Sequence, residues 1–63
     1  MIVHFLLGED DSIFVAAAQI AAIREAGTLL AIYLAGGEPI HAPSNDYNRS
    51  AVALWQAYVE VQK

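Results

Sequence analysis

The stretch Asp10–Gly27, DDSIFVAAAQIAAIREAG, decides the fold that the sequence predicts. It is rich in alanine, the strongest helix former, and residues that favour helix ends lie at both termini. Asp11 or Ser12 can accept a hydrogen bond from a free N–H of a first helical turn, and Gly27 can adopt the left-handed conformation that ends many helices. The sequence therefore predicts one helix near residues 12–26.

Apolar runs on either side of this segment predict strands near residues 2–7 and 29–34. Their uninterrupted hydrophobic composition is typical of strands buried on both faces. A strand, a helix and a strand in this order favour a parallel pair joined by a right-handed crossover. Gly36 and Gly37 then predict a tight turn, which leads into a short antiparallel edge strand near residues 39–42.

A second helix is predicted near residues 46–61, with Ser44 or Asp46 as its cap. Its expected core face carries Tyr47, Ala51, Leu54, Tyr58 and Val61. The predicted fold is a small single α/β (α+β) domain spanning residues 1–63, with the order β-α-β-β-α and a three-stranded mixed sheet.

The composition predicts association with another chain. The 63 residues include no cysteine, and 57% are hydrophobic while only 16% are charged, against about 25% charged in typical globular chains. A domain of this size has too little interior to hide so much apolar surface, so we expect a twofold homodimer, or a docking site for another protein. The candidate contact residues, which lie on the predicted outer helix faces, are Phe14, Val15, Ala18, Ala22, Val52, Trp55 and Val59.

The charge excludes several classes of partner. A net charge of −4 with only three Lys and Arg residues provides no basic stripe for nucleic acid and disfavours anionic membranes. The first residues show no signal-peptide pattern, and no run of about 20 apolar residues could span a bilayer. We therefore expect a cytoplasmic protein that binds neither nucleic acid nor membrane directly, and no cofactor.

Three consecutive carboxylates, Glu9, Asp10 and Asp11, lie between the first strand and the predicted helix. The segment from Leu6 to Ser12 resembles the acidic turn of response-regulator receiver domains, and that resemblance implies Mg²⁺ binding. The chain lacks the other aspartates and the lysine of that family. Acids at a helix N-terminus stabilise the helix dipole by about 0.3–1 kcal/mol each, so we expect a structural role and no metal site.

A second hypothesis concerns all the acids that lie in predicted turns or at a helix start. A small, acidic, cysteine-free chain resembles in composition the inhibitors encoded by phages and mobile elements, such as anti-CRISPR-type proteins. That resemblance implies a viral inhibitor that blocks a nucleic-acid-handling protein through an acidic patch. The patch would consist of Glu9, Asp10, Asp11, Glu38 and Asp46.

A third hypothesis is a minimal enzyme that depends on Mg²⁺ or on histidine. His4 and His41 could approach each other if the first and third strands were adjacent, but zinc usually needs three or four ligands. No serine lies in a nucleophile elbow, so no catalytic residue is assigned. The sequence thus favours a non-enzymatic protein–protein interaction module, and it does not identify the partner.

Overall fold

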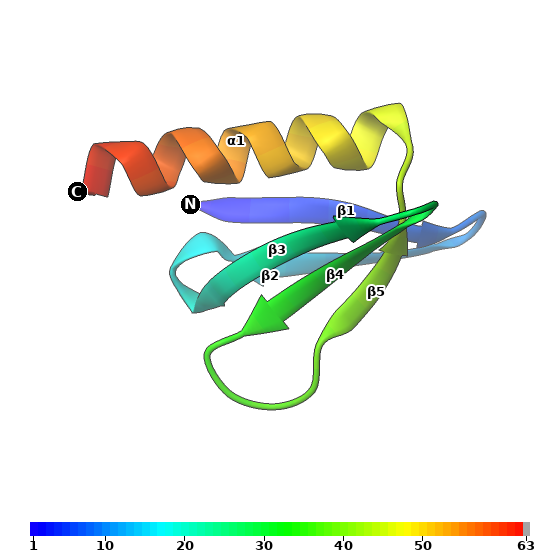
Figure 1. The fold of residues 1–63 in the computed structure, drawn as a ribbon, viewed down its shortest axis with the longest axis horizontal. Helices are drawn as coiled ribbons and strands as arrows, with labels where there is room; N and C mark the ends of the chain where they lie inside the picture. The colour runs from blue at the N-terminus through cyan, green and yellow to red at the C-terminus, as the bar shows by residue number, and fades with distance from the viewer. Residues whose placement is uncertain (63) are drawn as a thin grey trace.

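The computed structural model describes residues 1–62, which form five strands and one α-helix in an α+β fold (Figure 1). The short 3₁₀ turn η1, Ala17–Gln19, joins the second strand to the third. The regular elements are β1 (Ile2–Gly8), β2 (Asp11–Ala16), β3 (Ile20–Ala26), β4 (Leu29–Leu34), β5 (Ile40–Pro43) and α1 (Asp46–Gln62).

The helix predicted near residues 12–26 is wrong, because this segment forms β2, η1 and β3. Ile13, Phe14 and Val15 are residues that pack well on a pleated surface and lose side-chain freedom in a helix. Alanine is the strongest helix former and is depleted in strands, so the alanine-rich composition favoured the wrong conformation. Pairing with the adjacent strand β1 satisfies the backbone of β2, and tertiary pairing outweighs a weak helix propensity.

The strands form two antiparallel sheets, one in the order β1-β2 and the other in the order β3-β4-β5. The predicted parallel pair and the mixed sheet are therefore wrong, because no crossover helix separates the strands. Gly27 does adopt a left-handed φ of 62°, but it does so in the two-residue turn that brings Ala26 opposite Leu29. A glycine at the first position of such a turn suits a type II′ hairpin.

The remaining elements confirm the predicted strands near residues 2–7, 29–34 and 39–42, and the helix near 46–61, within a residue or two. The antiparallel pairing of β4 with β5 is confirmed as well. The cap of α1 is Asn45, which lies between the two predicted candidates. Its Oδ1 accepts a hydrogen bond from the backbone N–H of Asn48 at 2.8 Å, so the first turn has a partner for one of its free donors.

The core lies between the two sheets and the inner face of α1. Val3 and Phe5 of β1 are buried, whereas Ile2 on the opposite face is 61% exposed. The expectation that this strand is buried on both faces is therefore wrong, and β1 alternates as a half-buried strand does. The buried hydrophobic residues are Val3, Phe5, Val15, Ala17, Ile20, Leu30, Ile32, Ala42 and Ala51.

The face that helix α1 presents to the core matches the predicted one only in part. Val52 and Trp55 pack against the core beside Ala51 and Tyr58. Of the predicted core residues, Tyr47, Leu54 and Val61 are exposed instead. The two stripes have nearly the same helical spacing, so periodicity did not decide which one faces the sheets.

Asn48 determines this orientation of α1. Its side chain is fully buried and bridges the two sheets. Oδ1 accepts a hydrogen bond from the N–H of Leu6 at 2.8 Å, and Nδ2 donates to the carbonyl oxygens of Leu6 at 2.8 Å and Pro43 at 2.7 Å. The amide thus connects β1 to the end of β5, where no strand pairing joins the two sheets.

Candidate functional site

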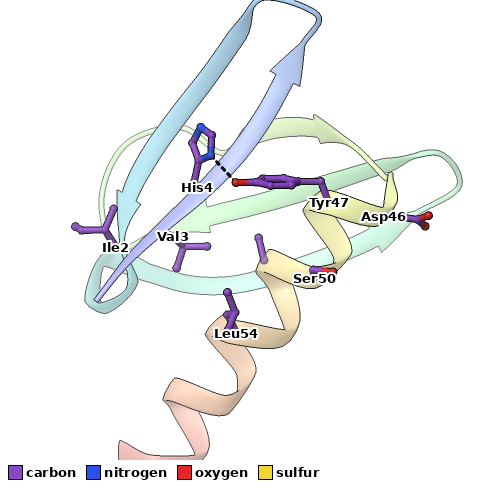
Figure 2. A pocket seen from close by; sticks show the side chains of 8 residues that line it. Ile2, Val3, His4, Asp46, Tyr47, Ser50 and Leu54 are labelled. Carbon is purple, nitrogen blue, oxygen red and sulfur yellow. Dashed lines mark hydrogen bonds between the residues drawn. The ribbon is translucent and has the colours of Figure 1, made fainter.

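A groove of about 540 Å³ lies between β1 and the first turns of α1 (Figure 2). Its walls come from the first residues of β1 and from helix positions three, four and seven residues apart. Such positions share one face of a helix. The lining residues are Ile2, Val3, His4, Asp46, Tyr47, Ser50, Ala51 and Leu54.

An aromatic cluster connects the groove to β2. The β1–β2 register places Phe14 opposite His4, and the two rings stack with centroids 4.3 Å apart and planes 17° apart. The edge of Tyr47 faces the same imidazole at 5.6 Å, and the Tyr47 hydroxyl lies 2.7 Å from Nδ1 of His4. Figure 2 shows this bond between the strand and the helix. The cluster therefore holds together residues from three elements.

Large apolar side chains around this cluster are exposed to solvent. The exposed fractions are 61% for Ile2, 70% for Phe14, 48% for Tyr47 and 61% for Leu54. Together with His4, these residues line the groove or stack on its wall. We call this set, Ile2, His4, Phe14, Tyr47 and Leu54, the apolar face.

The predicted contact residues lie in several places. Phe14 belongs to the apolar face, whereas Val15, its neighbour in β2, is buried. Ala18 in η1 and Ala22 in β3 are exposed. On α1, Val52, Trp55 and Val59 are half-buried.

Sequence reasoning missed the other members of the apolar face. Ile2 and His4 lie two residues apart in β1, so they share the face opposite to Val3 and Phe5. Two-residue alternation in the N-terminal strand could have identified them. Tyr47 and Leu54 are seven residues apart, a spacing that predicts one helix face, and the sequence prediction places that face against the core.

The structure does not gather the five predicted acidic residues at one site. Glu9 and Asp10 form the β1–β2 turn, and Asp11 begins β2. Asp46 begins α1 and pairs with Arg49 at 2.7 Å. Glu38 belongs to the β4–β5 loop, which lies at the bottom of Figure 1, away from the β1–β2 turn at the right. The predicted role of Asp10 and Asp11 at a helix N-terminus is wrong, because no helix begins there.

The two histidines lie on different sheets and do not pair. The contacts of His4 are those with Phe14 and Tyr47, while His41 is exposed on β5 opposite Ala31. Across residues 1–62, no three His, Asp or Glu side chains are grouped closely enough to hold a metal ion.

Comparison with known proteins identifies no relative of this chain. No protein-family model matches the sequence. No curated protein matches it, and no solved structure matches its fold. In the part of the chain that the structure describes, no helix is long and apolar enough to cross a membrane.

Proposed function

We propose that the chain is a non-enzymatic protein–protein interaction module that self-associates through its apolar face. The observation that carries this proposal is the exposure of Ile2, Phe14, Tyr47 and Leu54 around one groove. Isolated exposed apolar residues are ordinary, but a contiguous group of them usually marks an interaction site.

The composition of the apolar face resembles the centre of a protein interface. None of its five residues is Asp, Glu, Lys or Arg, and three of them carry aromatic rings. Interface centres are depleted in charge and enriched in aromatic residues. The nearest charged residue in the groove lining, Asp46, pairs with Arg49 at the rim.

The size of the chain favours a second copy as the partner. The total accessible surface is 4189 Å², and a standard interface covers about 800 Å² on each partner. Association would therefore bury roughly a fifth of the surface of each chain. Fully burying one large apolar side chain contributes about 1.5–3 kcal/mol, and a twofold dimer buries the same residues on both copies.

The concentration dependence of the melting temperature tests this proposal. A dimer unfolds at a higher temperature as protein concentration rises. We expect this dependence for the unmodified chain and for Gln56→Glu, which places the same charge on an exposed position of α1 outside the apolar face. Phe14→Glu should remove the dependence while leaving the far-UV circular dichroism unchanged. A melting temperature of the unmodified chain that is independent of concentration would contradict self-association.

A further inference from the structure

The two sheets have four outer edges, and three of them are protected against pairing with another strand. At the outer edge of β1, the Asn48 amide bonds both backbone groups of Leu6, and Pro39 and Pro43 flank or end β5. The outer strand β3 carries Arg24 and Glu25 and a register irregularity near its start. Proline, charge and irregular register are the usual devices that keep sheet edges from pairing.

The fourth edge, that of β2, has none of these devices. Asp11–Ala16 contains no proline, lysine or arginine, and its one charge lies on the first residue. The irregularity of the β1–β2 ladder lies in β1, between Leu6 and Gly8. A strand of six residues is about 20 Å long. The shorter dimensions of the molecule are 24 and 21 Å, so the unprotected edge of β2 is nearly as long as the molecule is wide.

The hydrogen-bond pattern shows which backbone groups point outward from this edge. The N–H and C=O of Leu6 bond to Asn48 and therefore point away from β2. Leu6 faces Ser12 in the register, so this pair is not hydrogen-bonded and the backbone groups of Ser12 also point away from β1. Because the pattern repeats every two residues, the same holds for Phe14 and for the N–H of Ala16. Within residues 1–62, no backbone group of a turn, a loop or another element forms a hydrogen bond with the outward-pointing groups of Ser12 or Phe14.

We propose that β2 of one copy pairs antiparallel with β2 of a second copy, about a twofold axis at Phe14. This inference rests on the self-association proposed above and specifies its geometry. Phe14 would exchange two backbone hydrogen bonds with Phe14 of the second copy. The N–H of Ala16 would donate to the C=O of Ser12 in the second copy. The two-stranded sheets of the two copies would then form one sheet of four strands, in the order β1-β2-β2-β1.

The side chains in this register are compatible with self-pairing. Ile13 faces Val15 of the second copy on the core side, and such apolar cross-strand pairs are favourable. Ser12 faces Ala16, and Asp11 faces Ala17, so the two carboxylates do not oppose each other. On the outer side the two Phe14 rings are neighbours, and the stacked His4 of each copy extends this aromatic row. A second copy of the chain is therefore a complementary occupant of the edge.

Ala16 offers a substitution that blocks the edge without disturbing the fold. Its φ is −64°, which is the value that proline imposes, and the preceding residue Val15 is already extended, as a residue before proline must be. Its N–H points outward, so Ala16→Pro removes no hydrogen bond to β1. The proline ring would occupy the position where the N–H donates to the second copy.

Sedimentation of Ala16→Pro and Leu54→Glu beside the unmodified chain tests the edge pairing. We expect Ala16→Pro to be monomeric with an unchanged circular dichroism spectrum. Leu54→Glu, on the helix side of the apolar face and away from the β2 edge, should still dimerise, but more weakly than the unmodified chain. A dimeric Ala16→Pro together with a monomeric Leu54→Glu would overturn edge pairing while leaving self-association intact. A monomeric unmodified chain would overturn both proposals.

Amide hydrogen exchange tests the same geometry without any substitution. At a free-chain concentration ten times the dimer dissociation constant, only about one chain in twenty is monomeric, so the N–H of Phe14 should exchange about twentyfold more slowly than in the monomer. The exposed N–H of Gly36, in the β4–β5 loop, serves as the reference amide. Equal exchange of the Phe14 amide in dimer and monomer would overturn the pairing of β2 with β2.

Discussion

The Asn48 amide makes the structure depend on a single buried polar side chain, and Asn48→Ala is the substitution that tests this dependence. The change removes three side-chain hydrogen bonds, two to Leu6 and one to Pro43. It leaves one N–H and two carbonyl groups without these partners at the junction of the sheets. The cost of an unsatisfied buried group is about 1–3 kcal/mol.

Because the groups of Leu6 and Pro43 are only partly buried, water will replace some of the lost bonds. We therefore expect a loss of about 3 kcal/mol, near the lower end of the combined range. Small domains have a free energy of unfolding of about 0.05–0.15 kcal/mol per residue, or about 3–9 kcal/mol for a chain of this length. Asn48→Ala should thus remove at least a third of the stability, and it should unfold the chain if the total is at the low end.

Urea unfolding at one fixed protein concentration provides the assay. It is followed by the fluorescence of Trp55, the only tryptophan in the sequence, which packs against the core. Asn45→Ala is the matched control, since it removes the helix cap and costs about 1 kcal/mol. Asn48→Asp keeps the shape of the side chain but cannot donate to the two carbonyl oxygens, so it should be at least as destabilising as Asn48→Ala at neutral pH. If Asn48→Ala costs no more than Asn45→Ala, the bridging role is wrong.

Three further predictions concern single positions. Gly27→Ala should lower stability by about 1–2 kcal/mol in thermal unfolding, because φ at Gly27 is 62° and the left-handed region penalises a side chain. The control is Gly36→Ala, which should not destabilise, because φ there is not positive and a Cβ meets nothing within 4 Å. Equal losses of stability at both positions would refute the turn assignment. Val15→Glu should abolish the folded circular dichroism spectrum, because it buries an unpaired carboxylate at a core position. Phe14→Glu, at the neighbouring exposed position, should still fold. A folded Val15→Glu would show that the sides of β2 are wrongly assigned. Tyr47→Phe should cost about 0.5–1 kcal/mol, since one hydrogen bond to His4 is lost at a solvent-accessible site, and a double-mutant cycle with His4→Phe should find the two losses non-additive.

The sequence predicted the parts of the fold whose residues favour one conformation. The apolar runs of β1 and β4 and the helical spacing of α1 were sufficient to locate those elements. The segment of residues 11–26 was not predictable in this way, because its alanines favour a helix and only pairing with β1 and β4 makes it form strands. Gly27-Thr28 was the informative signal, since a glycine followed by a small residue between apolar runs is also typical of a hairpin turn.

The candidate site was only partly predictable. Phe14 was identified as a contact residue, but for a helix face that does not exist. On α1 the two apolar stripes are equivalent by spacing, and Asn48 decides between them through bonds to Leu6 and Pro43. Those partners are 42 and 5 residues away in sequence, so the choice depends on tertiary contacts that no local pattern contains.

The mass of the unmodified chain in solution tests the central claim, self-association, most directly. Sedimentation equilibrium over a range of concentrations up to the millimolar level measures this mass without a label or a substitution. The proposal predicts a transition from 6.8 kDa to twice that mass as the concentration rises through the micromolar range. A constant mass of 6.8 kDa at every concentration would contradict the claim.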